Sequence, residues 1–167
     1  MVIAVDYGTT FTGVAYLPVK QKDQDLDALA NDIKVIQSWK KHSAEKVPSD
    51  YSYSPSLIHA CDQWGYDIDD NSRVLKWTKL ALEESNNRTL ELENLTKLLY
   101  EMRVVDLNDE TVINNKIPRH LAKEPEDIVV DYLENVAEKT LDEISSQVGR
   151  HVPDNIPVDI VVTHPAV

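Results

Sequence analysis

Near the start of the chain, an acidic residue, a glycine and two threonines have the types and spacing of a phosphate-binding turn. They are Asp6, Gly8, Thr9 and Thr10. A glycine between two strands lets the backbone adopt positive φ and turn its N–H groups toward a bound anion, and the threonine hydroxyls add donors. The Asp6 carboxylate is a hard oxygen ligand that can hold a hydrated Mg²⁺ beside phosphates. These residues therefore predict a turn that binds phosphate groups together with Mg²⁺.

The same residues also have a simpler interpretation. Gly8 and the two threonines are common turn residues and could serve only the turn of a surface hairpin. A short motif remains a hypothesis until its structural context supports it. The sequence around the motif therefore has to provide that context.

Two predicted strands flank the motif. The run Val2 to Val5 is short and rich in β-branched residues, which predicts a buried strand closed by Asp6. Phe11 to Leu17 predicts a second strand that returns beside the first. Gly13 in this second strand leaves room for another segment to approach.

Hydrophobic spacing predicts several further elements in the first three quarters of the chain. Residues 18–32 are polar and acidic and predict a solvated loop, either without regular structure or with one helical turn. The elements expected after this loop are a third strand at 33–38, a small hairpin formed by 56–60 and 63–66, and amphipathic helices at 73–82 and 90–102.

The clearest predicted helix runs from Pro125 to just before Gly149. Proline is favoured at the first helical position, glycine just after the last, and Glu126 and Asp127 suit the positive helix start. One apolar stripe at a period of 3.6 residues runs between them, formed by Ile128, Val129, Tyr132, Leu133, Val136, Thr140, Leu141, Ile144 and Val148. A last strand at 158–163 follows. A mixed sheet with a covering helix places the chain in the α/β class.

Composition narrows the class of partner and the compartment. The chain has 167 residues, the size of one domain, and a formal net charge of −12, which argues against binding to nucleic acid or to an anionic membrane surface. Its single cysteine, Cys61, permits no internal disulfide. Met1 leads straight into the first strand without a signal peptide, and no apolar run is long enough to span a bilayer. We therefore predict a cytoplasmic or nuclear protein.

The turn motif resembles the first phosphate loop of the actin-like ATPase superfamily. The resemblance is closest to the seventy-kilodalton heat-shock chaperone family, in which an acidic residue, a glycine and paired threonines occur in this order. Three later stretches agree in order and rough spacing, namely Val47-Pro48-Ser49, Gln63-Trp64-Gly65-Tyr66, and the long helix followed by Val161-Val162-Thr163-His164-Pro165-Ala166. Trp64-Gly65-Tyr66 and the segment Lys76 to Leu80 are similar to divergent, fungal-type members.

The resemblance implies an architecture. It is the ribonuclease H-like first lobe of an actin-like ATPase, with a core formed by 1–38 and 125–167 and an inserted small subdomain at 39–124. The core would be incomplete at its C-terminal end, so the chain would be an N-terminal fragment of a nucleotide-binding domain. We then expect an exposed apolar strip near Ile160 and Val162, with marginal stability or self-association.

The resemblance also implies ligands and partners. ATP or ADP with Mg²⁺ would be the cofactor, bound by Asp6, Gly8, Thr9, Thr10 and Phe11. Asp6 would hold Mg²⁺ through water, and hydrolysis would require a second lobe. Protein clients or co-chaperones are the implied partners, with no nucleic acid and no membrane.

Two departures from the family keep other functions open. The chaperones use a lysine of the inserted subdomain to position the attacking water, but Asp67 to Asp70 follow Trp64-Gly65-Tyr66 here. Lys76 and Lys79 lie nearby, on a predicted helix where charged residues usually face solvent. The four glycines form no second cluster that could serve as a second phosphate hairpin. No catalytic residue is assigned. The alternatives are a non-catalytic nucleotide-binding or protein-interaction module of the same fold, and a small-metabolite kinase of the superfamily.

Overall fold

The computed structural model describes residues 1–18, 26–40, 42–53, 62–82, 89–107, 123–148 and 157–163. The features of the sequence that lie outside these ranges include the predicted strand at 56–60, Cys61, Gly149 and the ending His164-Pro165-Ala166. Within the described residues, no helix is both long enough and apolar enough to cross a membrane.

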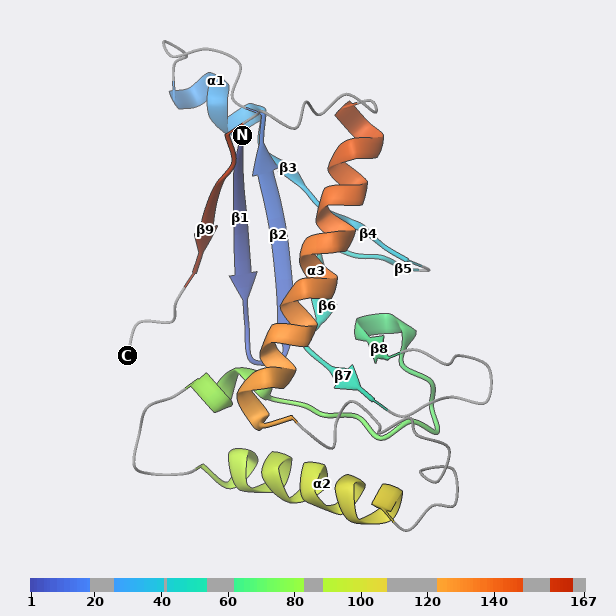
Figure 1. Cartoon of the computed structure of the whole chain (residues 1–167). Coiled ribbons are helices and arrows are strands. Elements are labelled where there is room, and N and C mark those ends of the chain that lie inside the picture. The colour runs from blue at the N-terminus through green and yellow to red at the C-terminus, as the bar shows by residue number, and fades with distance from the viewer. Residues whose placement is uncertain are drawn as a thin grey trace.

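A five-stranded mixed sheet forms the centre of the fold (Figure 1). Its strands are β1 (Val2–Tyr7), β2 (Phe11–Leu17), β3 (Lys34–Val35), β6 (Lys46–Pro48) and β9 (Asp159–Val162). The order is β3-β2-β1-β9, and β6 also pairs with β2. The β1–β2 pair is antiparallel and the β1–β9 pair is parallel. The predicted α/β class and mixed sheet are therefore confirmed.

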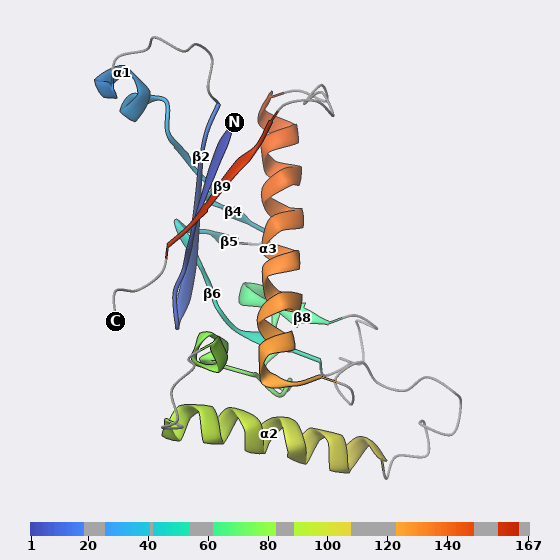
Figure 2. The ribbon, with the colours of Figure 1, turned by 60° about the vertical axis from the view of Figure 1, so that its left-hand side comes forward.

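The long helix α3 (Pro125–Val148) covers one face of this sheet (Figure 2). Side chains alternate between the faces of a strand, so the buried Thr12, Val14 and Tyr16 of β2 point to one face and Gly13 and Ala15 to the other. The helix buries most of its predicted stripe in a single hydrophobic core, at Ile128, Val129, Tyr132, Val136, Thr140 and Ile144, whereas Leu141 is exposed. The predicted covering helix is confirmed.

Strand β9 lies at the end of the sheet order beside β1, and its apolar side chains are open to solvent. Ile160 is 67% exposed and Val162 is 58% exposed. Between β1, α3 and β9 lies an apolar groove of about 430 Å³, into which Leu133 and Leu141 of α3 also face. The exposed apolar strip expected from the sequence is therefore present.

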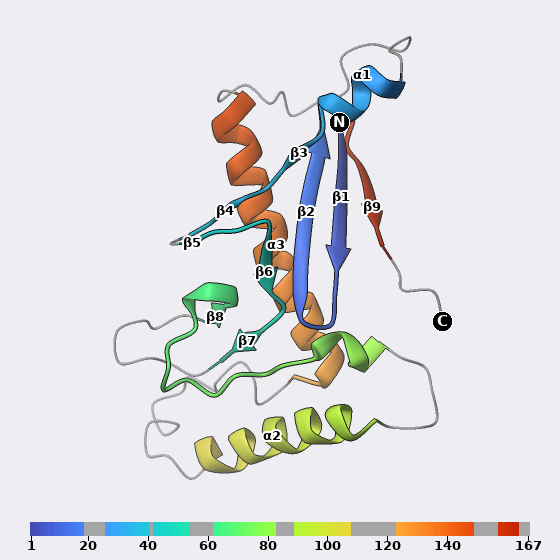
Figure 3. The ribbon, with the colours of Figure 1, turned by 180° about the vertical axis from the view of Figure 1, so that it is seen from behind.

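The predicted third strand is shorter than expected. The strand β3 spans only Lys34–Val35 beside β2. The Ile36 N–H still donates to the carbonyl of Val14 at 2.8 Å, and the Ile36 side chain is buried completely. The chain next leaves the sheet in a hairpin of β4 (Ser38–Trp39) and β5 (His42–Ser43), which projects beyond β3 (Figure 3). Burial of Ile36 and Trp39 on the core side explains the early departure.

Of the predicted small hairpin, the structure describes only the second half, and this half pairs with an earlier segment. Strand β8 (Gln63–Trp64) is antiparallel to β7 (Tyr51–Ser52), and a short 3₁₀ helix, η1 (Gly65–Asp67), follows it. Tyr51, Tyr53 and Trp64 belong to the same core as α3. The Tyr53 hydroxyl also donates to the buried carboxylate of Asp131 on α3.

The predicted helix at 73–82 is wrong. Leu75 is extended and exchanges two backbone hydrogen bonds with Tyr51, and Trp77 has a φ of 57°. Only Thr78–Leu82 is helical, as the 3₁₀ helix η2. The apolar spacing of this segment was misleading about which side chains are buried. Leu75 and Thr78 lie off the apolar stripe that predicted the helix, yet both are fully buried.

The remaining helices lie at the two ends of the sheet as Figure 1 is drawn, α2 (Leu90–Leu107) and η2 at the lower end and α1 (Leu26–Asn31) at the upper end. Helix α2 confirms the predicted helix at 90–102, and η2 lies between it and the β1–β2 turn. The six-residue helix α1 lies within the predicted loop. The division into a core and an insert at 39–124 stays a prediction, although β6, from within that range, is a strand of the main sheet.

Candidate functional site

The candidate site is the turn between β1 and β2. The backbone N–H of Gly8 donates to the carbonyl oxygen of Phe11 at 3.1 Å, which closes the turn tightly. A Cβ atom on Gly8 would lie 2.4 Å from that oxygen, so no side chain fits there. Among the described residues the only glycine with positive φ is Gly65. The predicted need for glycine at position 8 is therefore real, but its cause is close backbone approach rather than a left-handed conformation.

Thr9 and Thr10 form the tip of the turn with their hydroxyl groups available. Within the described part of the chain, neither hydroxyl is hydrogen-bonded to another residue. Thr10 and Phe11 are exposed, Phe11 at 46%. The turn can therefore offer two hydroxyl donors to a ligand without breaking an internal hydrogen bond.

The turn is held from inside by Ser49, which directly follows β6. The Ser49 backbone N–H donates to the carbonyl of Thr10 at 2.9 Å, and its hydroxyl donates to the carbonyl of Gly8 at 2.8 Å. The Thr12 hydroxyl lies 2.9 Å from the Ser49 hydroxyl. Because the single Ser49 hydroxyl hydrogen is used on Gly8, Thr12 is the donor in that bond. Both side chains are fully buried, so the shape of the turn is fixed by satisfied internal hydrogen bonds.

The Asp6 carboxylate lies beside the turn and has a partner on each oxygen. Lys46 Nζ is 2.7 Å from Oδ2, and the Thr163 hydroxyl donates to Oδ1 at 2.9 Å. These two hydrogen bonds, that from Lys46 foremost, lower the pKa of Asp6 below its usual value. The side chain is about half exposed, so the carboxylate is ionised, open to solvent and able to take further ligands.

Gly13 allows Lys46 to reach Asp6. In the strand register Gly13 lies between the two, opposite Asp6 in β1 and opposite Lys46 in β6. A Cβ on Gly13 would lie 3.4 Å from Cγ of Lys46. The prediction that Gly13 admits a neighbouring segment is confirmed, and that segment is β6. Asp6, Gly13, Lys46 and Thr163 border an open depression of about 220 Å³ on the sheet face turned away from α3.

Lys79 also reaches the turn, which the sequence interpretation missed. Its ammonium group donates to the backbone carbonyl of Tyr7 and lies 5.6 Å from the centre of the Tyr7 ring. The neighbouring Thr78 hydroxyl is 2.8 Å from the hydroxyl of Tyr7. Burial raises the pKa of Tyr7, which therefore stays neutral. Lys79 does not simply face solvent as expected, whereas Lys76 is half exposed beside Asp50.

No local sequence pattern could have located Lys79, because its position depends on a strained residue in the folded backbone. Trp77 has a positive φ, which is costly for a bulky residue and marks a sharp corner in the chain. That corner brings Thr78 and Lys79 onto Tyr7 together. The positions of Lys46 and Thr163 could not be predicted either, because only the strand pairing places them beside Asp6.

The donor set at Asp6 fits a metal ion that is carried by phosphates. Among the described residues, no group of three or more histidine, cysteine, aspartate and glutamate side chains could enclose a metal ion. Mg²⁺ usually keeps several waters and binds one or two carboxylates together with substrate phosphates. One accessible carboxylate beside a turn with free hydroxyl donors matches that mode, and the ammonium of Lys46 stands in for a cation there.

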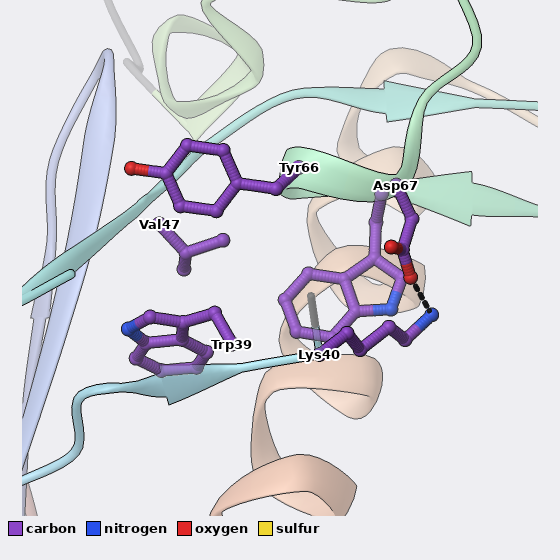
Figure 4. Close-up of a pocket in the computed structure, with 6 residues that line it drawn as sticks. Trp39, Lys40, Val47, Tyr66 and Asp67 are labelled. Atoms are coloured by element: carbon purple, nitrogen blue, oxygen red, sulfur yellow. Dashed lines mark ion pairs between the residues drawn. The ribbon is translucent and has the colours of Figure 1, made fainter. Parts of the chain in front are cut away.

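A second hollow, beneath β8, is too small to be a ligand site. It measures about 10 Å³ and is lined by Trp39, Val47, Trp64 and Tyr66 (Figure 4). An ion pair between Lys40 and Asp67, at 2.6 Å, closes one side. A space of this size holds at most one water molecule. The β1–β2 turn is therefore the better candidate.

Comparisons of the chain with models of protein families, with curated proteins and with solved structures find no match. What the site can bind is therefore inferred from its own residues.

Proposed function

We propose that this chain is the nucleotide-binding first lobe of an actin-like, chaperone-like ATPase, and that the β1–β2 turn binds the phosphates of ATP or ADP with Mg²⁺. The observation that carries the proposal is the turn itself. Gly8 keeps the backbone bare, the Thr9 and Thr10 hydroxyls are available, and an accessible carboxylate lies beside them. The hairpin, the mixed sheet and the covering helix α3 support the same assignment.

Each residue of the turn has a separate role in the proposal. The backbone N–H groups of residues 9–11 and the hydroxyls of Thr9 and Thr10 would donate to the β- and γ-phosphates, while the Gly8 N–H stays bonded to the carbonyl of Phe11. Asp6 would hold the water shell of Mg²⁺. The metal ion would neutralise phosphate charge and fix the phosphates in place. The internal hydrogen bonds of Ser49 keep the turn in one shape before the ligand arrives.

Lys79 is the candidate for the cation that the family places near the terminal phosphate. Its ammonium group is bonded to the carbonyl of Tyr7, one residue before Gly8. A lysine side chain is long and flexible enough to move from a carbonyl to a nearby phosphate. We infer that Lys79 supports binding of the γ-phosphate, with hydrolysis requiring a second lobe.

A non-catalytic interaction module of the same fold is the second candidate. The exposed apolar groove beside β9 favours it, because large exposed apolar patches mark surfaces that are covered in an assembly. Protein clients or co-chaperones are the partners proposed for either candidate.

Binding of a fluorescent ADP analogue tests the proposal. Asp6→Asn should weaken binding in the presence of Mg²⁺ about tenfold or more and change it little in EDTA, since a charged ligand contact contributes about 1.5–3 kcal/mol. Asp159→Asn is the matched control, because it removes the same charge at the other end of β1. Equal affinities for the wild type and Asp6→Asn in Mg²⁺, or no binding at millimolar ADP, would contradict the proposal.

A further inference from the structure

The carboxylate proposed to hold Mg²⁺ already carries a cation of the protein itself. Lys46 Nζ is 2.7 Å from Oδ2 of Asp6, and the Thr163 hydroxyl occupies Oδ1. A metal ion and an ammonium group cannot share one carboxylate oxygen at such distances without strong repulsion. A cation that binds at this oxygen, directly or through its water shell, must therefore compete with Lys46.

The position of Lys46 is built into the strand pairing. Asp6, Gly13 and Lys46 form one row across β1, β2 and β6. The Lys46 side chain crosses the row over Gly13, with its Cγ and Cε 3.4 and 3.5 Å from where a Cβ atom of Gly13 would be. The base of Lys46 is also fixed, because its carbonyl accepts a hydrogen bond from the Tyr66 hydroxyl and Val47 is buried beside it. The ammonium group therefore reaches Asp6 along a path that the sheet provides.

The ammonium end is nevertheless free to exchange. The side chains of Lys46 and Asp6 are 53% and 51% exposed, and exposed ion pairs of this kind form only a few times more often than they break. The turn where phosphates are proposed to bind starts two residues after Asp6. Phosphate groups there would offer the ammonium a second anionic partner and release the carboxylate.

We propose that Lys46 is a positioning residue that occupies the metal position at Asp6 in the absence of nucleotide and leaves it when phosphates bind. Binding of a divalent cation at Asp6 then depends on nucleotide. This inference rests on the proposed function, since it concerns the same carboxylate. It assigns to Lys46 a different role from that of Lys79, whose ammonium is bonded to the carbonyl of Tyr7 rather than to Asp6.

The test is binding of Mn²⁺ to the full chain without nucleotide, measured from the electron paramagnetic resonance signal of the free ion. Lys46→Met should bind Mn²⁺ about 3- to 6-fold more tightly than the wild type. Without the Lys46 ammonium group, the whole population has an Asp6 carboxylate that is free to bind metal. Gly13→Val should have the same effect, since a branched side chain blocks the path of Lys46 but keeps its charge. Lys97→Met, which removes a charge from an exposed pair on α2, is the control and should match the wild type.

Adding Asp6→Asn to either variant should abolish the gain. With saturating ADP, the difference between Gly13→Val and the wild type should shrink. Two outcomes would overturn the inference. One is a gain in Mn²⁺ affinity in Lys46→Met but not in a folded Gly13→Val, which would mean that only the charge of Lys46 matters. The other is equal Mn²⁺ affinity in Lys46→Met and the wild type. If wild type binds Mn²⁺–ADP through Asp6 while those affinities are equal, only the inference about Lys46 fails. If no variant binds Mn²⁺–ADP, the proposed function fails and the inference with it.

Discussion

The β1–β2 turn and strand β9 both lie beside β1, yet they differ in how far other segments contact them. The turn is tied by polar contacts from Lys46 and Ser49 of one segment, from Thr78 and Lys79 of another, and from Thr163 of a third. Strand β9 is paired along β1, while its apolar side chains face solvent and an open groove. One region is already shaped before a ligand binds, and the other leaves apolar surface uncovered.

The contrast indicates what each region can bind. A turn of fixed shape with free hydroxyl donors suits a small anionic ligand, whose binding depends on the position of a few polar groups. An apolar groove suits a packed protein segment, whose binding depends on the area removed from water. Substitutions should therefore act on shape and charge at the turn, and on association at β9.

The largest expected effect comes from Tyr132, which supports the turn from α3. Its ring lies 5.9 Å from the ring centres of both Tyr7 and Trp64, and its hydroxyl donates to the carbonyl of Pro48. Tyr132→Ala should lower the free energy of unfolding by about 3–5 kcal/mol, whereas Tyr132→Phe should cost about 1 kcal/mol. Val130→Ala, at an exposed position of α3, should change it by about 0.5 kcal/mol or less. Urea denaturation measures all three, and equal losses for Tyr132→Ala and Val130→Ala would contradict this packing.

The next effect concerns the bare backbone of the turn. Gly8→Ala should cost about 1–3 kcal/mol, because the new methyl group would meet the rigid carbonyl of Phe11. At Gly13 an added methyl group meets the flexible side chain of Lys46, so Gly13→Ala should cost about 0.5 kcal/mol or less. Thermal unfolding of the two variants compares them directly. A Gly8→Ala protein as stable as Gly13→Ala would show that the turn is looser than described.

A smaller effect is the pH dependence of the ion pair at Asp6. Hydrogen bonds from Lys46 and Thr163 lower the folded-state pKa of Asp6 below its ordinary value of 3.8. The resulting stabilisation is present above that value and is lost as the pH falls through the lowered pKa. Because both side chains are half exposed, Lys46→Met should cost only about 0.5 kcal/mol at neutral pH. This difference from the wild type should fade on acidification in chemical denaturation, and a difference that grew toward low pH would contradict the assignment.

The smallest effect on stability is expected at β9. Ile160→Thr with Val162→Thr should change the free energy of unfolding by about 0.5 kcal/mol or less per site, because both side chains are largely exposed. The same pair should reduce concentration-dependent self-association, which analytical ultracentrifugation detects. Unchanged association in the double variant would place any self-association outside the β9 groove.

Local patterns were sufficient to predict the hairpin and the long helix. The second strand covers Phe11–Leu17, as its spacing predicted, and α3 begins at Pro125 and ends at Val148, just before Gly149. Both elements are long and have one clear period and clear end signals, so tertiary contacts did not override them. The segment at 73–82 had a helical spacing as well, but backbone pairing of Leu75 with Tyr51 prevailed over it.

The candidate site was predicted only in part, because half of it is assembled from distant segments. Asp6, Gly8, Thr9, Thr10 and Phe11 are close in sequence and lie together in the β1–β2 turn and the strand ends beside it. Lys46 and Thr163 reach Asp6 through the pairing of β2 with β6 and of β1 with β9. Such register is decided by the packed sheet rather than by local sequence, so these partners could not be read from spacing.

The most direct test of the central claim is a map of backbone amide chemical shifts on adding Mg²⁺–ADP to the isotope-labelled chain. We expect saturable shifts at Gly8, Thr9 and Thr10, which are lost in Asp6→Asn, and no shifts at Val158 and Ile160 beside the apolar groove. Shifts confined to that groove, or no shifts at millimolar nucleotide, would contradict the assignment of the β1–β2 turn as a phosphate site.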